Sequence, residues 1–495
     1  MSSSERTFDV VVVGAGGAGL AAAIEARAAG GSVLLLEKNT APGGSTSWSV
    51  GSVTASNTPH QLAKGISDGP EDHWEDMAKF PGPPQERDND ELRRILCDEM
   101  PDTFRWLLES GIRFYGPMPE PPHRVPRMHN VLPNSTAFIQ HLTRRASRAG
   151  VTLKTSSAVG GLTVENGRVV GVTLADGGAC RAAGGVVLAT GDFTASPELK
   201  ARHMGEQEAK VEAVNATATG DGQSMAEALG ARIVNGDLAL GPEIRFIAPV
   251  GKTLVQRIPP WPALAGLMAW SLDALPDRLL RPFIMQFVTT ALAPSPGLFE
   301  AGAILVNRDG ARFTNELDRP ALALPDQPDK IGYIILDRHL AEMFTRWPHF
   351  VSTAPGVAYA YLPDYRRNRP DVFNEAPDPD RLGRVLGMPC AALTATVAGR
   401  NAGTGNLRRL EDGPYVALGP VRSVFVHAEG GLAVDTRHRV LGADDQPIAG
   451  LYAAGSTGQG GLLLKGHGHH LAWAFASGRR AGRFAAAEAA PGPAR

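Results

Sequence analysis

Cysteine is scarce in this sequence. Only Cys97, Cys180 and Cys390 occur among its 495 residues. Their odd number and wide separation argue against a disulfide framework. No C-x-x-C or C-x-x-x-x-C pair is present, which argues against a thiol–disulfide reductase. We therefore expect three ordinary core thiols.

The sequence also lacks an excess of basic charge, an apolar leader and a long uninterrupted apolar run. A formal net charge of −2 provides no basic surface for nucleic acid. Residues 1–7 are polar and lack the apolar core of a signal peptide, so we expect a cytoplasmic protein. Prolines and charged residues interrupt the apolar stretch 242–296, which argues against a membrane span.

What the sequence does contain is a strand–turn–helix–strand pattern at its start. Residues 8–38 read FDVVVVGAGGAGLAAAIEARAAGGSVLLLEK. Residues 9–13 form a short β-branched run, which is typical of a strand buried on both faces. The Ala-rich run 18–29 favours a helix, and residues 32–36 predict a second buried strand. A chain of this length has room for two or three domains.

The glycines of this pattern have G-x-G-x-x-G spacing. Gly14 permits the tight turn, Gly16 lets the backbone approach a pyrophosphate, and Gly19 lets the helix pack close to the sheet. The helix N-terminus offers free N–H groups to phosphates. Glu37, at the end of the second strand, is placed to accept hydrogen bonds from an adenosine ribose. The pattern predicts dinucleotide binding; the alternative is a bare β–α turn.

Further along, the proline-rich segment 117–133 predicts irregular structure. It carries His123, Arg124, Arg127 and His129. Two interpretations remain open, a lid over a polar substrate group and a plain surface loop, of which we favour the loop. Helices are expected over 71–79, 89–110 and 134–149, and a hairpin with an Asn166-Gly167 turn over 151–174.

The stretch 242–296 is dominated by apolar and proline residues. We favour its interpretation as the core of a helical capping domain. The alternative is a hydrophobic entrance for a lipophilic substrate, resting on a bilayer surface through residues 242–299. The charged, proline-rich stretch 363–379 is expected to be a surface excursion.

The loop after Glu37 indicates which dinucleotide is bound. Residues 37–51 read EKNTAPGGSTSWSVG, and nothing in NAD-binding domains requires such a loop. This run resembles the flavoproteins of the fumarate reductase and 3-ketosteroid dehydrogenase superfamily. The resemblance continues through GVVLATG at 185–191, RFTNE at 312–316 and GLYAAG at 450–455, and it covers nearly the whole chain in the family's order.

The resemblance implies an α/β fold with a discontinuous, Rossmann-like FAD-binding domain, residues 1–240 and 428–495. An α+β capping domain, residues 241–427, is inserted into it. FAD is the implied cofactor. It is held non-covalently, because residues 43–48 lack the histidine to which some relatives attach flavin. The expected cofactor-binding residues are Gly14, Gly16, Gly17, Ala18, Gly19, Glu37, Lys38, Gly43, Gly44, Ser45, Thr46, Ala158, Ala189, Thr190, Gly191, Asp221, Gly455, Ser456, His469, His470 and Leu471.

Enzymes of this family move a hydride between flavin N5 and a carbon β to a carbonyl or carboxylate, and a proton at the α carbon. Arg319, three residues after Glu316, lies near the position of the acid arginine of fumarate reductases, where ketosteroid dehydrogenases carry a tyrosine. The alternative for Arg319 is an ion pair with Asp318. The alternative phenols are Tyr333, Tyr359, Tyr361 and Tyr415.

Two further residues are candidates for binding the substrate oxygen. His427 precedes Gly430-Gly431 at the spacing of the family's substrate-binding histidine. Lys465 aligns with a carboxylate-clamping arginine of fumarate reductases, although lysine lacks the bidentate fork. The alternatives are a structural histidine and a solvated surface lysine.

The resemblance also places the N-terminus of the final helix, from His469, toward flavin N1 and O2. His467, His469 and His470 lie close together in sequence, but no carboxylate or cysteine pattern accompanies them. We therefore expect no metal site.

The sequence departs from fumarate reductases at two places. Their His-Pro-Thr reads Pro242-Glu243-Ile244 here, and their proton-relaying Glu and Arg read approximately as Pro296 and Phe299. These losses favour a hydrophobic carbonyl substrate, ketosteroid-like or enone. The alternatives are a fumarate reductase-like enzyme with a carboxylate substrate, and an electron-transfer flavoprotein without C=C chemistry. The external electron donor or acceptor is left open.

Overall fold

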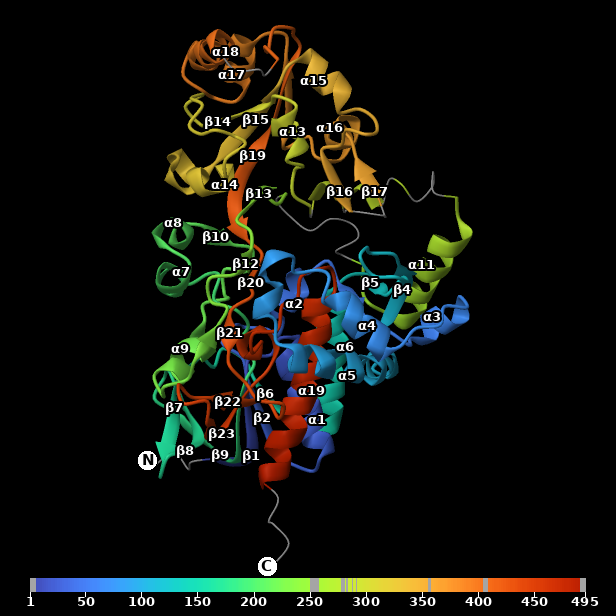
Figure 1. Ribbon diagram of the computed structural model, residues 1–495, viewed down its shortest axis with the longest axis vertical. Coiled ribbons are helices and arrows are strands. Elements are labelled where there is room, and N and C mark those ends of the chain that lie inside the picture. The colour runs from blue at the N-terminus through green and yellow to red at the C-terminus, as the bar shows by residue number, and fades with distance from the viewer. Residues whose placement is uncertain are drawn as a thin grey trace, which may run out of the picture.

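The computed structural model describes residues 6–249, 258–276, 281, 284–286, 288–290, 292–354, 358–403 and 408–489. Two lobes are stacked along the long axis of the molecule (Figure 1). The residues of the second hydrophobic core lie between 244 and 421, and we call the part of the molecule that packs around them the capping lobe. The remainder, which packs around the first core, is the lower lobe.

An eight-stranded sheet forms the centre of the lower lobe. Its strand order is β22-β23-β9-β1-β2-β6, and the β7–β8 hairpin joins it through β9. The pairs of β1 with β2 and β9, of β2 with β6 and of β9 with β23 are parallel. The strands are β1 (Arg6–Val13), β2 (Val33–Leu36), β6 (Thr152–Lys154), β7 (Val159–Glu165), β8 (Arg168–Leu174), β9 (Ala179–Leu188), β22 (Arg439–Leu441) and β23 (Pro447–Ala453).

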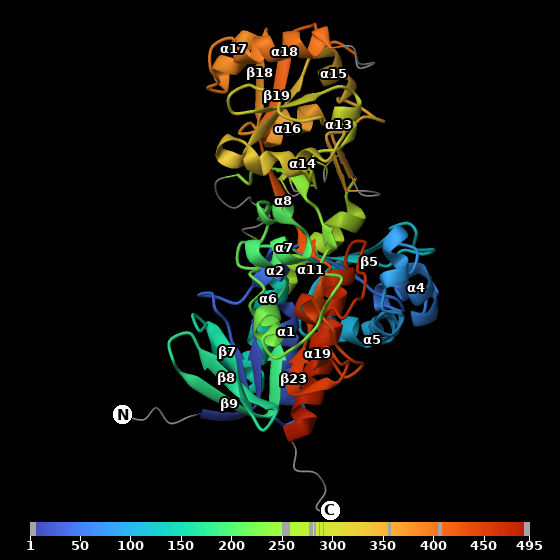
Figure 2. The same cartoon turned by 60° about the vertical axis from the view of Figure 1, so that its left-hand side comes forward.

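Helices cover this sheet, as expected for β-branched strands that are buried on both faces. α1 (Gly17–Ala28) is almost entirely buried, because α19 (His469–Ala489) packs along it. Both helices belong to one core with β1, β2 and β9. The expected α/β fold and the strand–turn–helix–strand start are thereby confirmed. The Asn166-Gly167 hairpin also forms, between β7 and β8, and it lies at the edge of the lower lobe, away from α4 and α5 (Figure 2).

Smaller elements complete the lower lobe. A three-stranded sheet has the order β3-β5-β4, and short pairs join β11 with β21 and β12 with β20. The strands are β3 (Ser52–Thr54), β4 (Arg113–Met118), β5 (Met128–Leu132), β11 (Ile233–Val234), β12 (Ala239–Leu240), β20 (His427–Ala428) and β21 (Gly431–Leu432). The helices are α2 (Gly44–Trp48), α3 (Pro59–Ala63), α4 (Pro70–Met77), η1 (Pro83–Arg87), α5 (Asp90–Glu109), α6 (Thr136–Ala149), α7 (Pro197–His203), α8 (Glu206–Ala209), α9 (Asp221–Glu227), α11 (Pro262–Ala274) and η4 (Gly455–Gly458).

A mostly antiparallel, six-stranded sheet forms the centre of the capping lobe. β19 (Tyr415–Phe425) pairs with β10, β13, β15 and β18, and β15 pairs with β14. The other strands of this sheet are β10 (Glu212–Ala213), β13 (Glu243–Phe246), β14 (Ile304–Asn307), β15 (Gly332–Leu336) and β18 (Phe373–Ala376). β16 (Ser352–Ala354) and β17 (Ala358–Ala360) pair with each other in a separate two-stranded sheet. The helices are α13 (Gly297–Glu300), α14 (Pro320–Ala323), η2 (Leu324–Asp326), η3 (Pro328–Lys330), α15 (Arg338–Met343), α16 (Leu362–Asn368), α17 (Pro379–Val385) and α18 (Ala392–Ala402).

The interpretation of segment 117–133 as an irregular lid or surface loop was wrong for its two ends only, because residues 119–127 contain no helix or strand. Its ends belong to β4 and β5. Because β4 is an edge strand, Pro117 can lack an N–H without losing a hydrogen bond to a neighbour. Arg127 and His129 are fully buried, and the Arg127 guanidinium pairs with Asp68 and Asp76, each at 2.6 Å.

The two other expectations for proline-rich segments were wrong in part. α11 packs against β4 and β5 of the lower lobe, whereas Ile244, Phe246, Met285 and Val288 of the same stretch do belong to the core of the capping lobe. Part of the stretch 242–299 lies outside the described residues. Segment 363–379 contains most of α16 and all of β18, and its Tyr365 is fully buried.

Of the three cysteines, Cys97 and Cys180 are buried as expected, but Cys390 is exposed. Cys390 lies in the turn between α17 and α18, where no sheet or helix covers it. None of the described helices has the length and hydropathy needed to cross a bilayer.

Candidate cofactor and active site

The turn between β1 and α1 is packed so tightly that only glycine fits. Gly14 has a φ of 100°, and a Cβ on it would lie 2.4 Å from the carbonyl oxygen of Ala189. A Cβ on Gly19 would lie 1.8 Å from the carbonyl oxygen of Gly14. α1 is therefore held directly against the turn, with its N-terminus at the carboxyl end of β1.

Space remains open beside this turn, where a ligand backbone can approach. A Cβ on Gly16 would meet nothing closer than the Gly43 oxygen at 3.7 Å, and one on Gly44 nothing closer than Gly16, also at 3.7 Å. The Thr46 hydroxyl accepts a hydrogen bond from the Gly17 N–H at 3.1 Å. The loop that carries Thr46 thus lies directly over the start of α1.

Glu37 is buried, and local donors fix its carboxylate. One oxygen accepts from the Ala15 N–H at 2.8 Å, and the other accepts from the Asn39 backbone N–H at 2.9 Å and side-chain amide at 2.8 Å. Oε2, which accepts only the bond from Ala15, can accept a further bond, as ribose recognition requires.

These groups line a pocket of about 830 Å³, which includes space open to solvent. Lys38 and Asp221 form an ion pair of 2.8 Å at its edge. Most of the predicted cofactor residues line it, from five separate parts of the chain. They are Gly14, Gly16, Gly17, Ala18, Glu37, Lys38, Gly44, Ser45, Thr46, Ala189, Thr190, Gly191, Asp221, Gly455 and Ser456.

The remaining predicted cofactor residues lie outside the pocket wall. Gly19 and Gly43 shape the turn from behind, where the Gly43 N–H donates to the Ala15 oxygen at 3.1 Å. Ala158 does not line the pocket, but the next residue, Val159, does. Leu471 is buried within α19. His469 and His470 face other histidines, in two separate groups.

His427 and His470 form a compact group around Glu429. The Nε2 atoms of His427 and His470 lie 3.4 and 3.2 Å from the same carboxylate oxygen, and their ring centroids are 3.6 Å apart. The other oxygen accepts from the Gln459 side-chain amide and, at 3.2 Å, from the Leu464 N–H. This arrangement fixes the orientation of both rings.

Electrostatics favour the ionised form of Glu429. Its burial alone would raise the pKa of the carboxyl. The charge of His470 and hydrogen bonds from His427 and His470 outweigh burial and hold the pKa of Glu429 well below its usual range. Glu429 is therefore a fixed negative charge one residue beyond Ala428, and it holds the Nε2 proton of His427.

The other proposed catalytic residues are not brought into this group. The Arg319 side chain is 67% exposed and pairs with Glu208 at 3.1 Å, rather than with Asp318. Lys465 is exposed, and its carbonyl oxygen accepts a hydrogen bond from His469 Nδ1 at 2.8 Å. Of the alternative phenols, Tyr415 donates to the Leu410 oxygen at 3.0 Å, and Tyr333 lies in the core of the capping lobe.

The comparison with protein families decides the identity of the cofactor. The family described as FAD binding domain matches residues 9–243 and 273–463. The chain belongs to this family. FAD is its cofactor, and the observed pocket fits that group, because a glycine-lined turn, a helix N-terminus and the fixed carboxylate of Glu37 meet in one place.

Relatives of this FAD-binding chain are oxidoreductases. It is 26% identical over 474 residues to an NADH:fumarate oxidoreductase of Klebsiella pneumoniae (strain 342); this covers 92% of the chain but only 44% of the relative. The open conformation of a flavocytochrome c3 fumarate reductase matches with a TM-score of 0.71 and 27% identity, over 99% of this chain and 79% of that one. A 3-ketosteroid-Δ4-(5α)-dehydrogenase from Rhodococcus jostii RHA1, in complex with 4-androstene-3,17-dione, matches with a TM-score of 0.59 and 25% identity over 98% of both chains.

Sequence reasoning missed two members of the histidine group of this flavoprotein, Glu429 and Gln459. A signal was present for one of them, since an acidic residue directly before Gly430-Gly431 follows His427 by two positions. For Gln459 no local pattern exists. It meets Glu429 only because η4 turns the chain back toward β20 and β21.

Proposed function

We propose that this chain is an FAD-dependent oxidoreductase that adds or removes hydrogen across a C–C bond beside a carbonyl or carboxylate group. The observation that carries the proposal is the attachment of the His427–Glu429–His470 group to the cofactor pocket. η4 contributes Gly455 and Ser456 to the pocket wall, and the next residue after η4, Gln459, donates to Glu429. A substrate held by His427 is therefore next to the flavin.

Bound FAD supplies the hydride chemistry, and the chain supplies binding, orientation and charge. Glu429 fixes the Nε2 proton of His427 and compensates for positive charge on the ring. A second proton on Nδ1 then makes His427 a donor toward the substrate oxygen. Such a fixed donor stabilises the charge that builds on the oxygen as the hydride moves.

We assign the proton at the α carbon to Arg319, on its sequence position alone. Its exposure means that the capping lobe has to approach the flavin before it can act. Replacement by lysine should then be nearly as damaging as replacement by alanine, because the flat guanidinium geometry is lost. If Arg319 only forms an exposed ion pair with Glu208, both changes should alter the rate little.

For the substrate we propose a molecule with an apolar body and a ketone or enone group. The cofactor loop itself carries an exposed apolar ring, since Trp48 on α2 is 69% exposed, and α2 lies at the end of the lower lobe that faces the capping lobe (Figure 1). The second candidate is a small unsaturated carboxylate. The names of the Klebsiella and flavocytochrome relatives favour it, whereas that of the Rhodococcus dehydrogenase favours the first.

A substrate panel followed by flavin absorbance separates these candidates. Photoreduced protein is mixed anaerobically with cyclohexenone, a 3-ketosteroid enone, fumarate and acrylate, and the oxidised protein with their saturated counterparts. Faster reoxidation by the cyclic enones than by fumarate supports the first candidate, and the reverse order supports the second. Reoxidation by quinone or dye alone would reject both and leave an electron-transfer flavoprotein. In these assays the same dyes act as the external electron donor or acceptor.

We also propose that α11 contacts a bilayer surface. Trp261, Leu267 and Trp270 are each about three-fifths exposed, and Leu62 of neighbouring α3 is 62% exposed. Flotation with phosphatidylcholine vesicles tests this. Trp270→Ser should reduce co-flotation severalfold, whereas Val385→Ser, an equally exposed site on the capping lobe, should not. Absence of wild-type flotation would end the proposal.

A further inference from the structure

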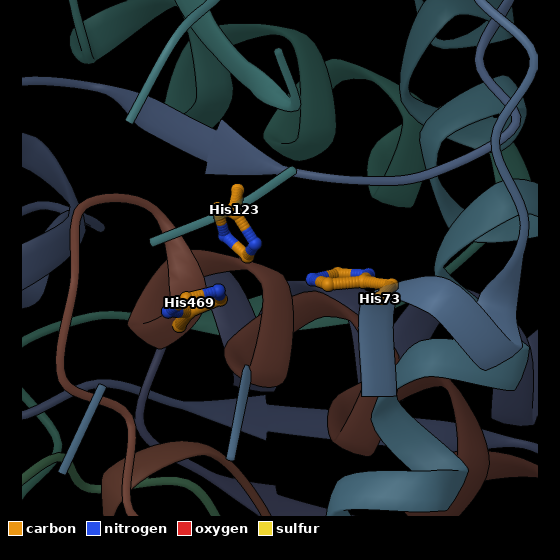
Figure 3. A group of neighbouring side chains, drawn as sticks. All are labelled: His73, His123 and His469. Carbon is orange, nitrogen blue, oxygen red and sulfur yellow. The ribbon is translucent and has the colours of Figure 1, made fainter. Parts of the chain in front are cut away.

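Three histidines from separate segments meet in the interior of the lower lobe. His73 lies in α4, His123 in the connection between β4 and β5, and His469 at the start of α19. Their ring centroids are 5.5, 5.8 and 5.3 Å apart. In Figure 3 the rings surround a common point, and each presents a nitrogen toward it.

The nitrogens of this cluster lack other uses. His73 and His469 are fully buried and His123 is 8% exposed. Within the part of the chain that the structure describes, neither ring nitrogen of His73 has a hydrogen-bond partner, and the Nε2 atoms of His123 and His469 have none. Four unpaired polar atoms in one interior site are costly, because buried polar groups are normally hydrogen-bonded.

Two of the rings are already oriented from behind. The Nδ1 of His469 donates to the Lys465 carbonyl oxygen at 2.8 Å, which leaves its Nε2 with a free lone pair. The Nδ1 of His123 accepts from the Arg127 guanidinium at 2.9 Å. A carbonyl acceptor behind the other ring nitrogen, as His469 has, is typical of histidines that bind metal. His123 instead accepts from Arg127, so its own proton lies on Nε2.

The dimensions also suit a single ion. One nitrogen from each ring lies within 4.8 Å of those of the other two. Ligand nitrogens about 2.0–2.1 Å from a tetrahedral Zn²⁺ are roughly 3.3 Å apart, so contraction of the cluster by a small ring movement suffices.

We propose that His73, His123 and His469 bind one divalent cation of the Zn²⁺ class, with a fourth position left for water. Imidazole ligands without thiolates suit zinc and its first-row neighbours. The ion replaces the Nε2 proton of His123, which leaves to solvent, and the Arg127 guanidinium compensates for the charge left on the ring. The Glu120 carboxylate, which acts electrostatically on His469, supplies negative charge nearby. The bound ion ties α4 and the β4–β5 connection to the start of α19.

Metal content of the holoenzyme tests the proposal. The flavoprotein is produced in medium supplemented with ZnCl₂, desalted, and measured by plasma mass spectrometry against its FAD absorbance. We expect about one Zn²⁺ per chain, and less than a tenth of that in His73→Gln and in His123→Gln. His349→Gln, an exposed histidine of the capping lobe, should keep the full content.

Two measurements on the wild-type protein test the proposal even if a variant does not fold. Wild-type protein grown with Co²⁺ should show the visible absorption of a tetrahedral nitrogen-ligated ion, and Zn²⁺ should raise its thermal midpoint. Wild-type protein with less than a tenth of an equivalent of Zn²⁺ and no cobalt spectrum would overturn the proposal. So would metal that persists in His73→Gln but is lost in Glu429→Gln, because the ion would then lie at the other group.

Discussion

At the scale of single residues, Glu429 has the clearest consequence for function. Its carboxylate holds two imidazoles through one oxygen and an amide and a backbone N–H through the other. Glu429→Gln keeps the shape but removes the charge that supports a doubly protonated His427. We expect turnover to fall tenfold to a hundredfold with FAD still bound, since one fixed donor is worth about 3 kcal/mol in the transition state.

The measurement is the rate of flavin reduction or reoxidation at saturating substrate, as a function of pH. A positioning role predicts that Glu429→Gln lowers this rate and changes its pH profile, because the carboxylate that both imidazoles contact is lost. An unchanged pH profile with an unchanged rate would assign Glu429 to structure alone. His427→Ala should lower the rate about a hundredfold at every pH.

His438 is expected to affect the pH dependence of the free energy of unfolding. It is fully buried against Trp473, neither of its ring nitrogens has a hydrogen-bond partner among the described residues, and burial, with Arg480 and Arg483 nearby, lowers its pKa to about 3. Between about pH 3 and 6.5 the unfolded chain therefore binds a proton on His438 that the folded chain does not bind. The stability due to the neutral ring is fully present above pH 6.5 and is lost as pH falls toward 3.

When the pH is lowered from 7 to 5, a ring of this kind reduces the free energy of unfolding by about 2 kcal/mol. Urea unfolding of wild type and of His438→Gln over this range should show a flatter pH dependence for the variant. His349→Gln should keep the wild-type slope, because that ring is exposed in the folded chain too. Equal slopes in all three proteins would mean that His438 is protonated in the folded state.

At the scale of elements, the contact between α1 and α19 depends on two glycines. A Cβ on Gly478 would lie 2.3 Å from the Ala18 oxygen, and one on Gly482 would lie 2.1 Å from the Ala22 oxygen. Either alanine substitution forces the helices apart, which costs about 1–3 kcal/mol or more. Gly399→Ala in α18 meets nothing within 4 Å and should stabilise by up to about 1 kcal/mol.

FAD affinity separates the two glycines, because Ala18 lines the cofactor pocket and Ala22 does not. Gly478→Ala should therefore weaken FAD binding more than Gly482→Ala, while both lower the thermal midpoint. Fluorescence titration of the stripped protein with FAD measures this. Equal affinities in both variants would show that α1 shifts as a rigid unit.

The elements also show how far the sequence alone could be interpreted. β1, α1 and β2 were predicted closely, because two apolar runs and an Ala-rich run between them are bounded by glycines, and the pocket residues on them followed. β4 and β5 were missed, because proline content describes local preference, whereas pairing with β3 is a tertiary effect. The His73–His123–His469 cluster was missed for the same reason, since its members are distant in sequence and only the fold joins them.

At the scale of the whole molecule, the two hydrophobic cores share no buried residue, and β19 is the long element between the lobes (Figure 1). Calorimetry should therefore show two transitions. FAD should raise only that of the lower lobe, since ligands stabilise the state that binds them. A single transition that shifts as a whole with FAD would mean that the lobes unfold together. The domain boundaries 240/241 and 427/428 stay a prediction until limited proteolysis places them.

Residues that are far apart in the sequence, such as Gly14 and Gly455, line the same pocket, and this has a consequence during synthesis. Gly14 leaves the ribosome more than 400 residues before Gly455, Ser456 and α19, the helix that backs α1. At about 5–20 residues per second, the first strand and helix wait on the order of half a minute for them. A nascent or prematurely terminated polypeptide therefore exposes an apolar α1 and cannot acquire flavin. Yellow colour thus reports that translation has passed α19.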